Sequence, residues 1–330
     1  MKTIRWGVLG AAKFAREHMA RAIHAAEGAE FAALATSDAA KAEAFQAFCP
    51  SLKIHASYEA LLADPGIDAV YIPLPNHMHV EWTIKALRAG KHVLTEKPIA
   101  LRAEEIDGII AERDRTGLLA AEAYMIPHHP QWQRAREWLL AGEIGTLRHV
   151  DAAFSFNNEA DTLNIRNRAD TGGGSLRDIG VYTFGSCRFM TGAEPVEVTA
   201  RIRRENGVEV FAQVAATLQG PTGKFTYGST TSMRLANRQE VTFQGDKGII
   251  RVGSAPFNAN LHDVAEVELH KPGQRVITDR FPADNHYVHQ VQAFGRSIRE
   301  GVPYPVPLEF VRGTQVMMDM AYDNAVDLGF

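Results

Sequence analysis

The sequence predicts an α/β protein of two domains, in which a doubly wound parallel sheet is followed by an α+β domain with a large, open, mostly antiparallel sheet. Up to about residue 123, short β-rich runs alternate with amphipathic helical patterns, which is typical of βαβ units. After about residue 145, strand-like runs follow one another with glycine-containing turns and no helix between them. This second rhythm is typical of an antiparallel sheet with one buried face.

Length and composition agree with two globular domains. At about 150 residues per domain, 330 residues correspond to about two domains, and we place them at 1–123 and 124–330. Hydrophobic residues make up 45% and charged residues 22%, which is average for a globular chain. Lys and Arg number 35 against 39 Asp and Glu, for a net charge of −4. With no basic excess to neutralise phosphates, we expect neither nucleic acid nor an anionic membrane as a partner.

The elements of the first domain follow from periodicity. Its helices repeat apolar residues at i, i+3 and i+4, as Ile106, Ile109 and Ile110 do. The predicted strands are 3–8, 30–35, 69–72, 91–94 and 118–122, and the predicted helices are 17–26, 41–48, 80–89 and 103–115.

In the second domain, four runs alternate apolar and polar residues and are separated by Gly220 and Gly223 or by Gly245 and Gly248. They predict a meander of neighbouring strands flanked by helices. The predicted strands are 196–200, 224–227, 240–243 and 249–252, and the predicted helices are 174–190, 285–300 and 308–327. The last helix is a candidate to pack back on the first domain.

Cysteine and histidine usage gives no sign of a metal or a disulfide. Cys49 and Cys187 have no metal-ligand spacing, so we expect reduced thiols and a cytoplasmic protein. No apolar run reaches the 18 residues of a membrane span, and we expect no membrane contact. The histidines at 77, 79, 128 and 129 have no third ligand at a known spacing, so no metal is predicted.

The first predicted strand runs into Gly10-Ala11-Ala12-Lys13-Phe14-Ala15. This segment fits the fingerprint G-x-G-x-x-G with alanine at the second and third glycine positions. A strand, a tight turn and a helix at the start of a βαβ unit direct backbone N–H groups at a pyrophosphate. The segment therefore predicts a Rossmann dinucleotide site formed by residues Gly10, Ala11, Ala12, Lys13 and Phe14. The alternative is a βα turn that binds nothing.

The end of the second strand distinguishes NADP from NAD. An acid directly at this point would bind the ribose 2′-hydroxyl of NAD, but the first two positions hold Thr36 and Ser37. Their hydroxyl groups, with Lys41 one turn later, suit a 2′-phosphate, so the sequence favours NADP. Asp38 keeps NAD open as the alternative, and its competing role is to cap the next helix.

Three further motifs resemble one known family. They are Tyr71-Ile72-Pro73-Leu74-Pro75-Asn76-His77-Met78-His79, Thr95-Glu96-Lys97-Pro98, and Gly172-Gly173-Gly174-Ser175-Leu176-Arg177-Asp178-Ile179-Gly180-Val181-Tyr182. In this order the motifs resemble the Gfo/Idh/MocA oxidoreductases over nearly the whole chain. Many relatives have histidine where Tyr182 stands. The tyrosine is similar to the branch that contains glucose-fructose oxidoreductase, dimeric dihydrodiol dehydrogenase and NADP-dependent xylose dehydrogenases.

The resemblance implies an N-terminal Rossmann domain, a C-terminal α/β domain and hydride transfer with NAD(P), with NADP preferred in most of this branch. It also implies cofactor contacts beyond the fingerprint. Pro73, Leu74, Asn76 and His79 would lie along the cofactor, Glu96 would contact the nicotinamide ribose next to Lys97, and Arg166 would match a family arginine near the nicotinamide.

Lys97, Asp178 and Tyr182 are the predicted catalytic residues. Lys97 follows the carboxyl end of a parallel strand, where ligands bind in open α/β sheets, and Pro98 predicts a sharp turn that can be cis. A surface ion pair of Glu96 with Lys97 is the alternative. Asp178 and Tyr182 are four residues apart in a predicted helix, so both project from one face.

Oxidising an alcohol with a nicotinamide needs a group that takes the hydroxyl proton, and the reverse reaction needs a proton donor. Tyr182 is predicted as that group. Lys97 would be its electrostatic partner and a substrate anchor, because an ammonium favours a phenolate and polarises a carbonyl. The proton can also be assigned to Lys97. Asp178 would bind a substrate hydroxyl. The non-functional alternative for Tyr182 is a tyrosine buried in the core. For Asp178 it is an acid that is stabilised near a helix N-terminus.

The leading functional hypothesis is an NADP-dependent dehydrogenase or reductase for a sugar or a related polyhydroxylated compound. The alternatives are a non-catalytic dinucleotide-binding sensor or repressor, and a sugar oxidoreductase that keeps its cofactor tightly bound. A complete set of Lys97, Asp178 and Tyr182 favours an enzyme. We also predict a homodimer, because alternating apolar residues such as Phe225 and Tyr227 would give the second sheet an apolar face that needs covering.

Overall fold

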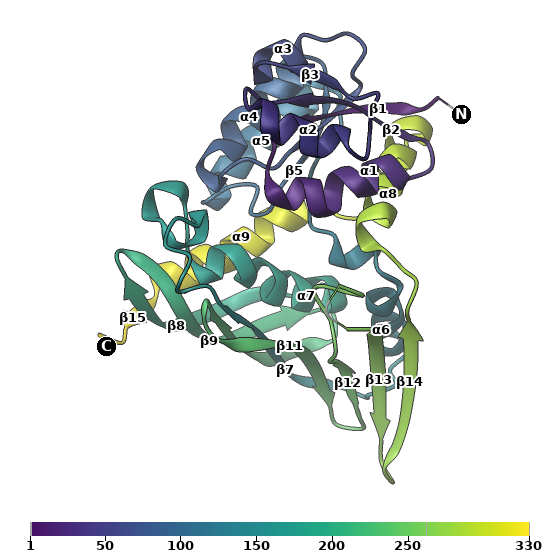
Figure 1. Cartoon of the computed structure of the whole chain (residues 1–330). Coiled ribbons are helices and arrows are strands. Elements are labelled where there is room, and N and C mark those ends of the chain that lie inside the picture. The colour runs from purple at the N-terminus through teal and green to yellow at the C-terminus, as the bar shows by residue number, and fades with distance from the viewer. Residues whose placement is uncertain (1, 262, 330) are drawn as a thin grey trace. The chain divides into compact units, whose positions relative to one another are not determined.

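The computed structural model describes residues 2–261 and 263–329. The chain folds into two compact units, whose elements are labelled in Figure 1. Unit 1 is Met1–Met125 with His286–Arg312, and unit 2 is Ile126–Asn285 with Gly313–Phe330. The sequence prediction places a single boundary at residue 123, so it assigns 286–312 to the second domain. The structure instead groups this segment with unit 1.

Unit 1 contains a six-stranded parallel sheet, sheet A, in the order β3-β2-β1-β4-β5-β6. This is the strand order of a doubly wound dinucleotide-binding fold, so the predicted fold class is confirmed. β3 has no counterpart among the predicted strands, because it is too short to give a periodic signal. The strands are β1 (Ile4–Leu9), β2 (Ala29–Ala35), β3 (Lys53–His55), β4 (Ala69–Ile72), β5 (His92–Thr95) and β6 (Ala120–Glu122).

Helices cover both faces of sheet A, and for this reason all four residues of β4 are buried. Trp6 of β1 packs against Phe294 of α8 with ring centroids 5.0 Å apart, which ties this late helix to the first strand. The helices are α1 (Ala20–Ala25), α2 (Ala39–Gln46), α3 (Tyr58–Leu62), α4 (His79–Arg88), α5 (Ala103–Thr116) and α8 (His286–Glu300), with a π-helical turn at Ala15–Met19 and a 3₁₀ turn at Asn76–Met78.

Unit 2 contains a nine-stranded sheet, sheet B, in the order β14-β13-β12-β11-β7-β10-β9-β8-β15. All pairs are antiparallel except β7 with β10 and β8 with β15, so the predicted mostly antiparallel sheet is confirmed. The predicted simple meander is wrong, because β7 lies between β10 and β11. The strands are β7 (Leu147–Asn157), β8 (Glu194–Glu205), β9 (Val208–Gly220), β10 (Gly223–Ser232), β11 (Arg234–Gly245), β12 (Ile249–Val252), β13 (Ala265–Lys271), β14 (Arg275–Phe281) and β15 (Ala325–Asp327).

One face of sheet B is covered by helices of the same unit, and Figure 1 shows α6 and α7 along it. The predicted terminal helix stops at Asp323, because the residues after it form β15. The helices are α6 (Pro130–Leu140), α7 (Val181–Thr191) and α9 (Leu308–Asp323, of which 313–323 belong to unit 2), with a π-helical turn at Leu176–Gly180 and 3₁₀ turns at Ile126–His128, Ile165–Asn167 and Ala169–Thr171.

The reason given for a homodimer is therefore wrong. Phe225 and Tyr227 are 5% and 2% exposed and lie on the face that the helices cover, where Tyr227 meets Phe184 of α7 with centroids 6.0 Å apart. The opposite face of β10 presents Thr226 and Thr230. The open face of sheet B is thus polar and not apolar.

Candidate active site

The predicted cofactor residues of unit 1 gather along the carboxyl edge of sheet A. In a doubly wound sheet, ligands bind beyond this edge, where the strand order reverses between β1 and β4. Gly10 follows β1 and Thr36 follows β2, while Pro73 follows β4 and Glu96 follows β5. Strand order alone therefore brings together four segments that are far apart in the sequence.

The turn after β1 needs glycine at position 10. Gly10 has φ +98°, and a Cβ there would lie 2.9 Å from Leu74 Cδ2 and 3.3 Å from Tyr58 Oη. The chain becomes helical at Lys13, and Ala15, which replaces the third fingerprint glycine, is fully buried. Alanine is small enough for this close packing. The turn and the start of the helix thus have the geometry expected of a phosphate-binding turn.

The residues that follow β2 are polar, and most of them are exposed. Asp38 Oδ1 accepts a hydrogen bond of 3.1 Å from the Lys41 N–H, so Asp38 caps α2, which is one of its two predicted roles. Lys41 Nζ lies 3.6 Å from Asp38 Oδ2, and both side chains are largely exposed. Ser37 is also exposed, whereas the Thr36 hydroxyl accepts a hydrogen bond from the Asp38 N–H.

The segment after β4 packs against the turn at Gly10. Leu74 is 7% exposed and packs under Gly10. His79 is fully buried, with Nδ1 2.7 Å from Pro98 O and Nε2 2.7 Å from Leu74 O. The two carbonyl groups favour the protonated ring, but burial outweighs them and lowers the pKa of His79 to about 4. His79 therefore joins two loops, whereas Asn76, at the start of the 3₁₀ turn, is half-buried.

Glu96 and Lys97 follow β5 as predicted, and the Lys97–Pro98 peptide bond is cis. Glu96 Oε1 accepts a hydrogen bond of 2.5 Å from the Tyr71 hydroxyl, and Oε2 accepts one of 3.2 Å from the Lys97 N–H. These contacts orient the Glu96 carboxylate. Lys97 is half-buried, whereas Pro98 and Ile99 after it are buried. The lysine is thus the accessible part of a buried turn.

Two buried residues of this region escaped the sequence analysis. Glu122 at the end of β6 is 2% exposed and accepts a hydrogen bond from the Ile99 N–H, and an acid that ends a buried strand was the available signal. Tyr287 of α8 contacts Phe14 and His18, with centroid distances of 5.8 and 5.7 Å. Burial raises the pKa of Tyr287, and the Glu96 carboxylate raises it further. No sequence pattern around Tyr287 indicates that it lies next to the dinucleotide fingerprint at residues 10–15.

In unit 2, Asp178 and Tyr182 lie at the start of one helix. The π-helical turn Leu176–Gly180 contains Asp178, and Tyr182 lies in the first turn of α7. The two are 8% and 7% exposed. Asp178 Oδ2 accepts a hydrogen bond of 2.6 Å from Arg166 Nε. The structure therefore places the predicted nicotinamide arginine on Asp178, with 38% of the Arg166 side chain exposed.

Two aromatic rings pack against Tyr182. The rings of Phe154 and Phe257 lie 5.7 and 5.6 Å from the Tyr182 ring, and these two rings stack on each other at 4.9 Å. Trp132 Nε1 donates a hydrogen bond of 2.7 Å to Pro256 O, which holds the segment that carries Phe257. Neither phenylalanine was predicted as a site residue, because only the fold brings them to Tyr182.

The glycine triplet joins the Arg166 loop to this helix. A Cβ on Gly173 would lie 2.3 Å from Arg166 O and 2.6 Å from Arg168 O, so only glycine fits. The N–H groups of Gly173 and Gly174 donate to Arg168 O and Arg166 O. These bonds place the loop against the start of the helix.

A buried carboxylate caps the same helix. Glu209 of β9 accepts hydrogen bonds from the Leu176 N–H at 2.8 Å and from the Ser175 hydroxyl at 2.6 Å. A negative charge is favourable at a helix N-terminus. Burial nevertheless raises the pKa of Glu209. Removing this acid would leave buried N–H and O–H groups without their acceptor.

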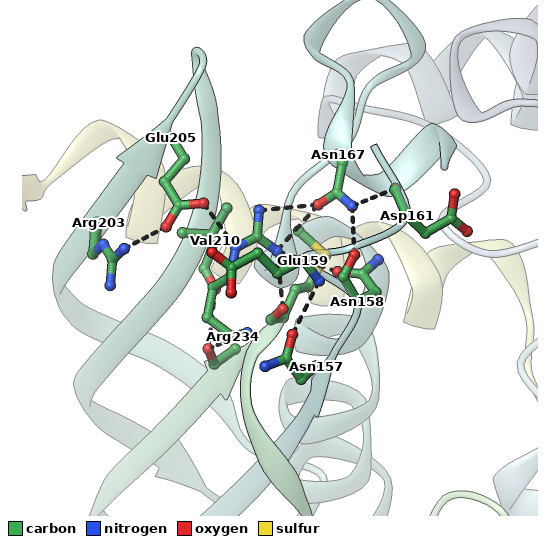
Figure 2. A network of polar contacts seen from close by, with 11 residues as sticks. Asn157, Asn158, Glu159, Asp161, Asn167, Arg203, Glu205, Val210 and Arg234 are labelled. Atoms are coloured by element: carbon green, nitrogen blue, oxygen red, sulfur yellow. Dashed lines mark hydrogen bonds and ion pairs between the residues drawn. The ribbon is translucent and has the colours of Figure 1, made fainter. Parts of the chain in front are cut away.

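A polar network holds the loop between β7 and the glycine triplet, as Figure 2 shows. Arg234 donates to Asn158 Oδ1 and Asn167 Oδ1 at 3.2 Å and to Glu205 Oε2 at 2.7 Å. Asn167 Nδ2 in turn donates to the carbonyl oxygens of Asn158 and Asp161. The residue just before Asn167 in the chain is Arg166, so this network anchors the loop that reaches Asp178.

Two classes of feature are absent from residues 2–261 and 263–329. No group of three or more His, Cys, Asp or Glu side chains there could hold a metal ion. In the same residues, no helix combines the length and apolar character needed to cross a membrane. The chemistry that these side chains offer is proton transfer, charge stabilisation and the binding of phosphate and hydroxyl groups.

Known proteins match the chain over most of its length. A model described as an oxidoreductase family with an NAD-binding Rossmann fold matches residues 4–124, and a GFO/IDH/MocA C-terminal domain model matches residues 132–251. A dTDP-3,4-didehydro-2,6-dideoxy-alpha-D-glucose 3-reductase of Saccharopolyspora spinosa is 37% identical over 307 residues, which cover 91% of this chain and 89% of that protein. A D-xylose 1-dehydrogenase (NADP(+)) of Haloferax volcanii is 33% identical over 321 residues, 97% of each chain.

Among solved structures, a 3-ketoreductase from Actinomadura kijaniata in complex with NADP and TDP-benzene is similar to the whole chain. The TM-score is 0.89 at 30% identity, with 100% of both chains covered. Further structures of that enzyme replace one lysine with alanine or glutamate, or one tyrosine with phenylalanine.

Proposed function

Because this chain belongs to the Gfo/Idh/MocA family of oxidoreductases, we propose that it is an NADP-dependent enzyme that acts on a sugar or a related polyhydroxylated compound. The observation that carries the proposal is the carboxyl edge of sheet A. It combines the glycine turn at Gly10, a hydroxyl and an amine at Ser37 and Lys41, and the half-buried Lys97 beside the buried Pro98 and Ile99. Relatives named as sugar reductases or dehydrogenases cover nearly the whole chain, which supports the substrate class. One of them is named for NADP(+), and a 3-ketoreductase similar to the whole chain was solved with NADP, which supports the cofactor.

The residues present suit a dinucleotide. Gly10 allows the positive φ of the turn after β1, and the backbone N–H groups of this turn and of the helix start are proposed to bind the pyrophosphate. Ser37 and Lys41 are exposed and can take a 2′-phosphate, whereas the Asp38 carboxylate already caps α2. When bound, the nicotinamide exchanges a hydride with the reacting carbon of the substrate. Glu96, oriented by Tyr71, is proposed to accept a hydrogen bond from the nicotinamide ribose.

Lys97 is proposed to bind and polarise the oxygen on the reacting carbon. Its ammonium group stabilises negative charge on that oxygen in either direction of reaction. His79 and Glu122 hold the backbone that follows Lys97, which limits the positions that the lysine side chain can take. Both the charge of Lys97 and its orientation should therefore contribute to the rate. In the Actinomadura enzyme, one lysine was replaced with alanine and with glutamate. A lysine was thus chosen for substitution in that similar enzyme as well.

Tyr182 is proposed as the proton donor in the direction of reduction and the proton acceptor in oxidation. The rings of Phe154 and Phe257 pack against Tyr182, which is itself buried, so few water molecules can compete with a substrate for the phenol proton. Asp178 is proposed to accept a hydrogen bond from a neighbouring substrate hydroxyl. Arg166 keeps this carboxylate in one orientation, and its exposed part can contact a second substrate oxygen.

A thermal-shift titration with NADP and NAD in parallel tests the cofactor assignment. A ligand that binds only the folded protein raises its stability by RT ln(1 + [L]/Kd), about 2.7 kcal/mol at 100 times Kd. We expect a larger shift with NADP, followed by turnover of an aldose, a polyol or a nucleotide sugar, detected by the absorbance of the reduced nicotinamide. No shift with either cofactor, in protein that carries no bound nicotinamide after purification, would contradict the enzyme and support a non-catalytic role.

A homodimer is also part of the proposal. The open face of sheet B presents small and polar residues such as Ala215, Thr217, Thr226 and Gly228, and side chains of this size let a second sheet approach closely. Light scattering should therefore give twice the mass of the chain. A monomer at micromolar concentration would contradict this assignment.

We assign the protein to the cytoplasm. Cys49 and Cys187 are both buried thiols, and burial raises the pKa of Cys187 to about 12, so it does not react readily. A chain with thiols and no disulfide suits a reducing compartment. Cell fractionation with an antibody against the protein checks this, and recovery from an oxidising compartment would contradict it.

A further inference from the structure

The turn that carries Lys97 is held on both sides by buried titratable side chains. The Ile99 N–H donates a hydrogen bond of 2.9 Å to Glu122 Oε1. On the other side, Pro98 O lies 2.7 Å from His79 Nδ1. Both side chains are at most 2% exposed, so water does not compete for these contacts. The single peptide group between Pro98 and Ile99 is therefore held at its N–H by Glu122 of β6 and at its carbonyl oxygen by His79 at the start of α4.

Glu122 is unusual for its location. It ends β6 opposite Thr95 of β5, in a strand that is otherwise alanine. Transfer of a carboxyl group to such a place is costly, and a hydrophobic residue would fill the volume at lower cost. The contact that offsets this cost is the hydrogen bond to Ile99. The acid thus stabilises the backbone of one turn rather than the core in general.

The charges around Glu122 include the groups proposed to act on the cofactor and the substrate. Glu96 and Lys97 lie near enough to affect its ionisation, with opposite signs, and Tyr304 faces it from the segment after α8. Burial is the largest effect and raises the pKa of Glu122 to about 7. Electrostatic coupling between two groups is reciprocal, so the charge of Glu122 also changes the electrostatic potential at Lys97.

We propose that Glu122 is a positioning residue for Lys97, which it orients by accepting the Ile99 N–H hydrogen bond without touching the substrate. This inference rests on the proposed role of Lys97. His79 supports the opposite side of the same turn and joins it to the segment under Gly10.

Two substitutions separate positioning from simple stability. Glu122→Gln keeps an oxygen acceptor for Ile99, whereas Glu122→Leu removes it. We expect Glu122→Gln to keep kcat within about threefold, and Glu122→Leu to lower kcat about tenfold or more, with the NADP Kd unchanged in both. The matched control is Glu112→Leu, because Glu112 is also a buried acid of unit 1 but pairs with Arg88 and Arg115 instead of the turn. It should lower the Tm and leave kcat unchanged.

A spectroscopic measurement tests the inference without turnover. Lysines of the full-length protein are labelled by reductive ¹³C-methylation, and the Lys97 signal is assigned with Lys97→Arg. In the wild type this signal should shift between about pH 6 and 8 as Glu122 ionises, and in Glu122→Gln this step should be lost. Glu122→Leu should displace the signal, and Glu112→Leu should not.

The two failures are distinguishable. If no sugar is turned over while the Lys97 signal behaves as expected, the proposed function fails and the positioning role stands. If Glu122→Leu retains full kcat, or leaves the Lys97 signal unmoved, the positioning role is overturned.

Discussion

The two units of this chain position their candidate site residues by different means. In unit 1, each segment follows the carboxyl end of a strand, so the backbone ladder of sheet A sets its place. In unit 2, Asp178 and Tyr182 depend on the start of one helix, which is held by Glu209 at Leu176 and by Arg166 at Asp178. A site built on a backbone ladder shares its support among many residues. A site built on buried polar contacts depends on a few side chains, each of which leaves an unpaired partner when removed.

The largest expected effect separates proton transfer in unit 2 from cofactor binding in unit 1. Tyr182→Phe removes the proposed proton donor, so kcat should fall about 10²- to 10⁴-fold while the NADP Kd stays the same. Steady-state kinetics and a fluorescence titration with NADP give the two values. Tyr227→Phe is the matched control, because it removes another buried hydroxyl of unit 2, and it should keep kcat. A Tyr182→Phe enzyme with wild-type kcat would remove this residue from the mechanism.

Next in size, a glycine-to-alanine substitution should act with opposite signs in the two units. Gly173→Ala forces a Cβ against the carbonyl oxygens of Arg166 and Arg168 and should cost about 3 kcal/mol of unfolding free energy. Gly108→Ala lies on α5 with no atom within 4 Å of the new Cβ and should add about 1 kcal/mol. Chemical denaturation of both variants measures the difference. Equal effects would mean that the Arg166 loop gives way more easily than the structure indicates.

The tip of β2 should control the choice of cofactor without affecting unit 2. Ser37→Asp places a carboxylate where the 2′-phosphate is proposed to bind, so the ratio of NAD to NADP affinity should rise about 10- to 100-fold. Binding titrations with both cofactors give this ratio. Ser51→Asp adds the same charge just before β3, at the amino edge of the sheet, and should leave the ratio unchanged. If Ser37→Asp does not alter the ratio, the 2′-phosphate binds elsewhere.

The smallest expected effect is a pH dependence in unit 1. Burial raises the pKa of Glu122 from 4.5 to about 7, so at pH 6 the folded protein keeps a proton that the unfolded chain has lost. As the pH rises to 8 the folded state also loses this proton. The free energy of unfolding should therefore fall by about 1.4 kcal/mol relative to Glu122→Gln. Urea denaturation at pH 6 and 8 measures this difference, and parallel pH profiles of the two proteins would contradict the buried proton.

The same division explains how much the sequence alone could predict. Residues of unit 1 such as Gly10, Ser37 and Lys97 lie just after short apolar runs, so periodicity was enough to place them at the carboxyl ends of parallel strands. Arg166 and Asp178 were both singled out, but no spacing rule connects them, and their contact was found only in the structure. Phe257, Glu209 and Tyr287 come from segments far along the chain. Long-range packing places such residues, and the periodicity of the local sequence does not predict that packing.

The edge strands of the two sheets have a consequence for the behaviour of the protein at high concentration. An edge strand offers unpaired N–H and C=O groups to a strand of another molecule, which is how sheets aggregate. Sheet A ends in β3 and β6, and sheet B ends on one side in β15, each only three residues long. The longer edge, β14, carries the charged residues Arg275, Asp279 and Arg280. Short and charged edges should protect both sheets from edge-to-edge aggregation during expression and storage.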